Sequence, residues 1–224
     1  MEMRYTHPIL PLAWRPLLDD ASFCVGKSNI HAFQWVHKEQ WPCQHVNIYG
    51  PKDSGKTHLG TLWAKKCNAV WLPCPHSSFI NSQGRYVLDV NINSLDEIET
   101  LSCLEAVQTL NAHCLWLSLR PVHLGNVQPA LRSRLMTFLC VEIQEPEDSL
   151  LVEVLKKAFR DVGLIACSQI LYFLMKRMDR SFSNIRDVVE KIHYYTLKHR
   201  ANLSIPVVKS ALAWKSYPQR IPGE

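Results

Sequence analysis

The chain lacks the features that mark membrane, secreted and zinc-binding proteins. Its eight cysteines form no CxxC or CxxH pair, which argues against a zinc site and a thioredoxin-like motif. No apolar run reaches the length of a membrane span. The start, MEMRYTHPILPLAWRP, has prolines and polar residues where a signal peptide needs a continuous apolar stretch. We therefore expect a cytoplasmic protein with reduced thiols and no membrane association.

Glycine-rich, serine-rich and single-sign charged tracts are also missing. The hydrophobic share of 47% and the charged share of 20% are ordinary for a globular protein, so the chain should be folded nearly throughout. The net charge of +5 comes from lysines and arginines interleaved with acids, which is weak support for a nucleic-acid partner. A length of 224 residues suits one core, or one core with a small satellite domain.

Short β-type runs alternate with helical stretches as far as about residue 145. The pattern predicts strands at 46–49, 69–72, 86–90, 114–119 and 138–143, and helices from about residue 29, at 56–66 and at 95–110. Such alternation indicates an α/β domain with a mostly parallel sheet and helices on its faces.

Beyond residue 145 the pattern is helical only. Apolar residues recur at helical spacing over 150–162, and Gly163 follows as a stop signal. Three serines precede helical stretches and are candidate N-caps: Ser168, Ser183 and Ser204. The expected organisation is a tail at 1–22, a core domain at 23–145, a helical domain at 146–213 and a tail without an assigned role at 214–224.

A phosphate-binding motif follows the first predicted strand. Residues 50–57 read Gly-Pro-Lys-Asp-Ser-Gly-Lys-Thr, a full match to GxxxxGK[ST] between a strand and a helix. Backbone N–H groups of such a loop surround an anion at a helix N-terminus. The expected nucleotide-binding residues here are Gly50, Pro51, Asp53, Ser54, Gly55, Lys56, Thr57 and His58. The alternative is a plain glycine turn.

Asp89 ends the predicted strand Tyr-Val-Leu-Asp and is the expected acidic partner of the loop. With the Thr57 hydroxyl it would ligate Mg²⁺; the alternative is a solvated acid at a strand end. Val90 and Asn91 follow, so the second acid that usually positions an attacking water is missing. Hydrolysis by this chain alone should be slow or absent, which leaves its status as an enzyme open.

Four further stretches resemble motifs of the DnaA family of AAA+ proteins: 23–29 (FCVGKSN), 119–121 (LRP), 131–135 (LRSRL) and 183–187 (SNIRD). They occur in the family's order. The resemblance implies a three-layer AAA+ P-loop domain followed by a small all-helical lid, with bound ADP or ATP and Mg²⁺. It also implies that Val25 lines the adenine pocket, that Ser118 lies near the sensor 1 position, and that Arg186 is sensor 2, the lid arginine that touches nucleotide.

By the same resemblance, Arg134 is an arginine finger that points at a neighbour's nucleotide. An arginine supplied in trans neutralises charge that develops on the γ-phosphate during hydrolysis. The partner it implies is the DnaA initiator, and a homo-oligomer is also open. The alternative is a surface arginine near a helix end, as the neighbouring Arg132 illustrates.

Within the family, the chain resembles the short Hda-type regulators. A complete DnaA continues into a helix-turn-helix domain, whereas this chain ends about a dozen residues after Leu212, so we expect no direct sequence-specific DNA binding. The segment 7–12 (HPILPL) is similar to a peptide that binds the sliding clamp, the β subunit of DNA polymerase III. Its expected contacts are His7, Leu10, Pro11 and Leu12. The alternative is a proline-rich tail that packs on the domain.

These observations predict a regulator that binds adenine nucleotide and the clamp and promotes hydrolysis of DnaA-bound ATP, limiting replication initiation. A related adaptor that tethers a partner without stimulating hydrolysis is one alternative. An autonomous P-loop ATPase or small kinase is another, disfavoured by the missing acid after Asp89.

Overall fold

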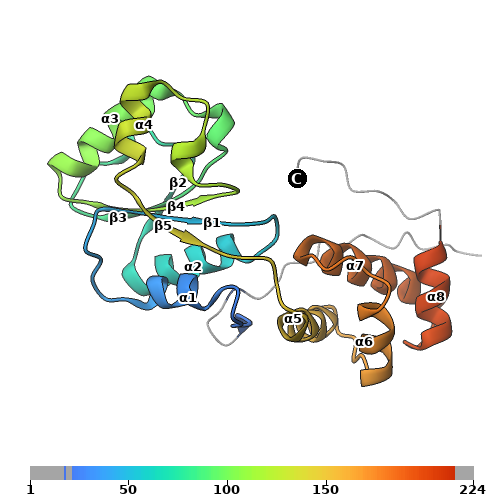
Figure 1. Cartoon of the computed structure of the whole chain (residues 1–224). Helices are drawn as coiled ribbons and strands as arrows, with labels where there is room; N and C mark the ends of the chain where they lie inside the picture. The colour runs from blue at the N-terminus through green and yellow to red at the C-terminus, as the bar shows by residue number, and fades with distance from the viewer. Residues whose placement is uncertain (1–17, 19–21, 215–224) are drawn as a thin grey trace, which may run out of the picture. The chain divides into compact units, whose positions relative to one another are not determined.

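A computed structural model describes residues 18 and 22–214, and the chain divides into two units, one of residues 18–147 and one whose described part is residues 148–214. Figure 1 shows the sheet of the first unit and the helices of the second. Within this described part, no helix is both long and apolar enough to span a membrane.

Five parallel strands form one sheet in the first unit, in the order β2-β3-β4-β1-β5. The strands are β1 (His45–Tyr49), β2 (Val70–Leu72), β3 (Arg85–Asp89), β4 (His113–Ser118) and β5 (Leu139–Glu142). The fold class predicted from the sequence is confirmed, and each strand lies within one residue of its predicted bounds.

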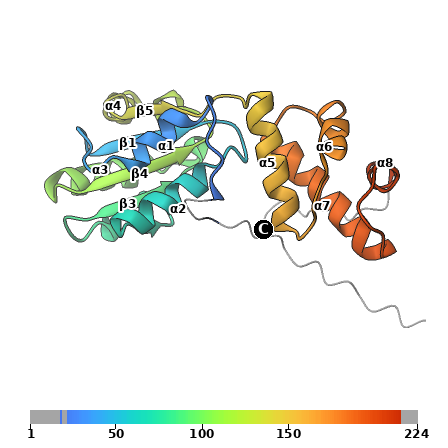
Figure 2. The same ribbon diagram turned by 90° about the horizontal axis from the view of Figure 1, so that it is seen from below.

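Helices cover both faces of this sheet (Figures 1 and 2). The helices are α1 (Ile30–His37), α2 (Lys56–Cys67), α3 (Glu97–Thr109) and α4 (Pro129–Leu135), with 3₁₀ turns η2 (Ser77–Phe79), η3 (Ile92–Ser94) and η4 (Val122–Leu124). Residues of α1 and α2 share one apolar core with Leu115 and Leu117 of β4, while α3 and α4 share the other with Cys114 and Trp116. Alternate residues of β4 therefore face opposite cores, which explains its uninterrupted apolar sequence.

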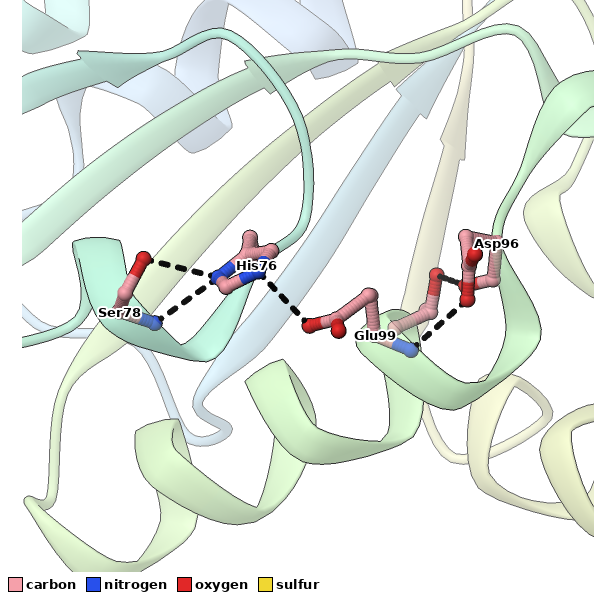
Figure 3. A network of polar contacts seen from close by, with 5 residues as sticks. His76, Ser78, Asp96 and Glu99 are labelled. Carbon is pink, nitrogen blue, oxygen red and sulfur yellow. Dashed lines mark hydrogen bonds and ion pairs between the residues drawn. The ribbon is translucent and has the colours of Figure 1, made fainter.

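The segment between β2 and β3 is anchored to α3 by polar contacts (Figure 3). His76 caps η2, because its Nδ1 accepts the Ser78 N–H at 3.1 Å, and its Nε2 lies 3.1 Å from a carboxylate oxygen of Glu99. Asp96 caps α3 by accepting the N–H of Glu99 at 3.0 Å. An irregular stretch of chain is thus held in place by side chains rather than by strand pairing.

The second unit contains α5 (Asp148–Asp161), α6 (Ser168–Met175), α7 (Phe182–His199) and α8 (Ile205–Ala213) around a single apolar cluster. Gly163 has φ +74° and its N–H reaches the carbonyl of Arg160 at 2.9 Å, so it ends α5 as predicted.

Two of the three predicted N-caps in this unit are wrong. Ser181, not Ser183, caps α7 and accepts the Asn184 N–H at 3.3 Å, because the buried Phe182 is already helical. Ser168 is the first residue of α6, whose N-cap is Cys167. Ser204 does occupy the N-cap of α8, without a side-chain cap hydrogen bond.

Candidate functional site

The loop between β1 and α2 lies at the carboxyl edge of the sheet, where ligands of open parallel sheets bind. A Cβ at Gly50 would lie 2.5 Å from the carbonyl oxygen of Ile143, so only glycine fits where the loop leaves β1. Gly55, the N-cap of α2, has φ +90°, a left-handed conformation that glycine adopts without steric cost. Both glycines of the motif therefore serve the loop's backbone, which leads into the N-terminus of α2.

Lys56 is held in this loop by backbone carbonyls. It is 8% exposed, and its ammonium donates to the carbonyl oxygens of Gly50 at 2.9 Å and Pro51 at 2.6 Å. Burial lowers its pKa, while the carboxylates of Asp89 and Asp53 act in the opposite direction. The result is a cation fixed in the loop that leads into α2, a suitable partner for a phosphate.

The structure brings Thr57 and Asp89 together from different elements. The Thr57 hydroxyl donates to a carboxylate oxygen of Asp89 at 3.3 Å, joining the start of α2 to the end of β3. A hydroxyl and a carboxylate beside a phosphate-binding loop are the oxygen ligands that Mg²⁺ prefers, so these residues fit the ion. Asn91 caps η3 by accepting the N–H of Asn93 at 3.1 Å, so its side chain serves the backbone.

Ser118 ends β4 at the same edge and is fixed by a buried asparagine that the sequence analysis missed. Asn47 is fully buried in β1; its amide donates to Ser118 Oγ at 2.9 Å, and its carbonyl accepts the N–H of Val122 at 3.1 Å. Ser118 Oγ donates in turn to the carbonyl of Arg120 at 2.6 Å. The signal in the sequence was a polar residue inside the apolar run of β1.

The stretch 23–29 packs against the loop. The ring of Phe23 lies 5.1 Å from that of His58, centroid to centroid, and a Cβ at Gly55 would come within 3.0 Å of it. Val25 is 45% exposed.

Glu147, which the sequence analysis also missed, fixes the same stretch by accepting hydrogen bonds from the N–H groups of Lys27 at 2.7 Å and Ser28 at 3.3 Å. Desolvation would raise the pKa of Glu147, but these hydrogen bonds, with one to its own backbone, lower it overall.

The chain is similar to DnaA in sequence and in fold. It is 23% identical over 218 residues to the chromosomal replication initiator protein DnaA of Nautilia profundicola, covering 83% of this chain and 50% of that protein. No protein-family model matches the chain. Domain III of Thermotoga maritima DnaA superposes with a TM-score of 0.70 at 15% identity, covering 89% of this chain and 97% of that one. AMPPCP-bound DnaA from Aquifex aeolicus superposes with a TM-score of 0.64 at 19% identity, covering 83% of this chain and 67% of that one.

The fold matches that of domain III of Thermotoga maritima DnaA. The chain spans about half the length of the curated relative that it matches, so the similarity concerns this module rather than the whole initiator.

Within the unit of residues 18–147, Arg134 lies away from the phosphate loop. It is exposed near the end of α4, and its guanidinium donates to the side-chain carbonyl of Gln108, near the end of α3, at 3.4 Å. Leu139, five residues later, pairs with Val46 at the beginning of β1, whereas the loop follows the opposite end of that strand. Five strand residues span about 16 Å. Arg134 is therefore close to the amino edge of the sheet, and the phosphate loop is at its carboxyl edge.

The other predicted residues are either in the helical unit or outside the described residues. Arg186 is on α7 of the helical unit, where its guanidinium lies 3.8 Å from the carboxylate of Glu190. The predicted clamp peptide, with His7, Leu10, Pro11 and Leu12, lies outside the described residues, as does the tail from 215 onward.

Proposed function

We propose that this chain is a DnaA-like AAA+ regulator that binds ADP or ATP, with Mg²⁺, in the loop 50–57. The observation that carries the proposal is the meeting of Lys56 with the Thr57–Asp89 pair at one end of the sheet. The similarity to an AMPPCP-bound DnaA supports adenine nucleotide as the ligand. Lys56 would neutralise the phosphates, Thr57 and Asp89 would hold the ion, and the ion when bound would offset phosphate charge. Val25 and Ser118 would contact the nucleotide from the core, and Arg186 from the helical domain 146–213.

The proposed regulatory role rests on Arg134. Its exposed position near the amino edge suits an arginine that enters the nucleotide site of a neighbouring AAA+ module rather than its own. A guanidinium placed there would stabilise the charge on a transferring γ-phosphate, a contribution of about 10³–10⁵ in rate where it has been measured. The neighbour we propose is the DnaA initiator carrying ATP, and the outcome is an initiator converted to its ADP form.

In this proposal the clamp peptide determines where the chain acts. Extended, proline-stiffened segments lose little conformational entropy when they bind an apolar groove, and Leu10 and Leu12 would be its anchors. Docking on the DNA-loaded clamp would confine the reaction to replicating DNA. The regulator itself would hydrolyse ATP slowly, because neither Val90 nor Asn91 is an acid.

The test is a reconstituted assay with pure chain, DNA-loaded clamp and ATP-loaded DnaA. The wild type should accelerate loss of DnaA-bound ATP, and Arg134→Ala should abolish the acceleration. Arg132→Ala is the matched control, because Arg132 lies on the same helix but turns its guanidinium to the carbonyls of Gly125 and Val127.

Each alternative has its own outcome in that assay. If Arg134→Ala accelerates loss of DnaA-bound ATP as fully as the wild type, Arg134 is not an arginine finger. Unchanged ATP turnover with the wild type would favour the tethering adaptor, and turnover by the isolated chain that Lys56→Ala abolishes would favour an autonomous ATPase.

A further inference from the structure

A hollow lies at the amino edge of the sheet, at the opposite end of the strands from the phosphate loop. It is lined by the segment 38–41 that follows α1, by the second half of α2, and by Arg85 and His113, the first residues of β3 and β4. Its volume is about 240 Å³, just below the range of about 300–1,000 Å³ for pockets that hold drug-sized ligands. A smaller ligand, with a single ring, would therefore suit it.

Two stacked indoles line this hollow. The rings of Trp41 and Trp63 lie 4.5 Å apart, centroid to centroid, and 7° from parallel. Both are fixed, because the indole N–H of Trp41 donates to the carbonyl of Trp35 at 3.0 Å, and Trp63 is 2% exposed. Cys67 adds a thiol whose pKa is raised by burial, so it is uncharged at neutral pH. The lining thus includes a rigid apolar surface, on which a flat ring can pack at little entropic cost.

Arg85 and His113 lie side by side on the face of the sheet that α1 and α2 cover. They are partners in the register of β3 and β4. Two residues further along, Val87 and Leu115 belong to the core shared with α1 and α2, and side chains two apart on a strand point to the same face. Burial, and the charge of Arg85, lower the pKa of His113, so its neutral ring can share a hydrogen bond without adding charge.

The charged residues that line the hollow are Lys38, Glu39 and Arg85. Lys38 is held over the ring of Trp35, with its ammonium 3.6 Å from the ring centroid. Arg85 is exposed and, among the residues that the structure describes, has no hydrogen-bond or ion-pair partner. Two cations and one acid leave a net charge of about +1, which suits a monoanion better than a phosphate dianion. A guanidinium binds a carboxylate through two parallel hydrogen bonds.

We propose that this hollow binds a small aromatic carboxylate, with its ring against the Trp41–Trp63 stack and its carboxylate on Arg85. His113, beside the guanidinium, would donate a further hydrogen bond. The site is separate from the phosphate loop and does not depend on nucleotide binding at residues 50–57.

The experiment is an NMR titration of the whole chain with cinnamate, a flat acid with one ring, and with its neutral analogue cinnamamide. The indole N–H resonance of Trp41, assigned with Trp41→Phe, reports on the hollow. Arg85→Gln removes the charge at an exposed position and keeps a polar side chain. Arg120→Gln is the matched control, because it removes an equal exposed charge beyond the far end of β4. Lys56→Ala tests whether the phosphate loop binds the probe instead.

The wild type should bind cinnamate with a dissociation constant on the order of 1 mM, and the Trp41 resonance should shift. Arg85→Gln should weaken binding of cinnamate about fivefold, as expected for an exposed ion pair, and should leave binding of cinnamamide unchanged. Arg120→Gln and Lys56→Ala should match the wild type with both ligands.

The inference would be overturned if the wild type bound no cinnamate, or if Arg85→Gln bound it as tightly as the wild type. Binding that leaves the Trp41 resonance unmoved, or that Lys56→Ala abolishes, would place the probe elsewhere and also overturn it. Equal affinity of the wild type for cinnamate and cinnamamide would remove the role of the carboxylate. The proposed function is tested separately, by titrating the same proteins with ADP.

Discussion

The two edges of the one sheet are organised in opposite ways. At the carboxyl edge, Lys56 is buried and bonded to two carbonyls, and Ser118 is fixed by a fully buried asparagine. Near the amino edge, Arg134 is exposed on a short helix with a long hydrogen bond to Gln108. A group that binds the chain's own ligand has to be preorganised, because every freedom it loses on binding reduces affinity. A group that serves a partner has to be exposed to reach it.

This contrast implies that substitutions at the two edges have separate effects. Changes at the carboxyl edge should alter nucleotide binding, and changes near the amino edge should alter stability or action on a partner. The following experiments either reproduce that separation or remove it.

The largest effect is expected at Lys56. Replacing it with alanine removes charge-assisted hydrogen bonds to phosphate, so affinity for ADP should fall about 100-fold, equivalent to ~3 kcal/mol. Titration calorimetry measures this directly. Lys52→Ala is the matched control, because it removes the same charge from an exposed position in the same loop and should cost little. Equal losses from both variants would mean that the loop attracts phosphate by charge alone, without a positioned lysine.

Acid should destabilise the amino edge. Burial, with a smaller contribution from His113, lowers the pKa of His45 to about 4. His45 stacks on Phe138 at 4.5 Å and accepts the indole N–H of Trp116 at 3.3 Å. The unfolded chain binds a proton near pH 6.5 and the folded one does not, so stability is complete above pH 6.5 and is lost as pH falls toward 4. By pH 5 the loss should be about 2 kcal/mol.

Urea unfolding at pH 7 and pH 5 checks this value. His45→Gln keeps an acceptor for Trp116 and does not titrate. Between pH 7 and pH 5, its free energy of unfolding should therefore fall by about 2 kcal/mol less than that of the wild type. An identical pH dependence in both proteins would assign the acid sensitivity to other groups, of which His113 is the nearest to consider.

Asp89 should matter only when Mg²⁺ is present. Asp89→Asn keeps the shape and the contact with Thr57 but removes the charge that would hold the ion. Affinity for ADP with Mg²⁺ should fall about tenfold, the loss of one charge-assisted contact, and affinity in EDTA should not fall. Calorimetry in both buffers separates the two cases. A loss of similar size in EDTA would mean that Asp89 stabilises the loop rather than an ion.

Much of this arrangement could be predicted from the sequence, for identifiable reasons. The strands could be predicted because both faces of the sheet are covered, which makes each strand a short apolar run bounded by turns. The meeting of Thr57 with Asp89 follows from parallel topology, which brings strand ends to one edge. These are consequences of local pattern combined with a general rule.

Contacts between distant side chains could not be predicted in this way. Asn47 bonds to Val122, and Glu147 bonds to Lys27. Both pairs are far apart in the sequence, and no local pattern in the sequence indicates that they meet. The N-cap of α7 was misplaced because Ser181 and Ser183 are equivalent locally, and only the burial of Phe182 distinguishes them.

The smallest effect is expected at Gly60, in the middle of α2. A Cβ there would come within 2.8 Å of Leu117 Cδ1 and 2.9 Å of Trp71 Cη2, so in Gly60→Ala these side chains or α2 itself must shift. Overpacking costs about 1–3 kcal/mol, and the better helix propensity of alanine returns about 1 kcal/mol, so a net loss of about 1 kcal/mol should remain. Because α2 also positions Lys56, affinity for ADP should fall modestly while stimulation through Arg134 persists at saturating nucleotide. Thermal unfolding and calorimetry give both values, with Thr61→Ala on the same helix as the control. A variant that is more stable than the wild type and binds ADP normally would show that α2 adjusts independently of the loop.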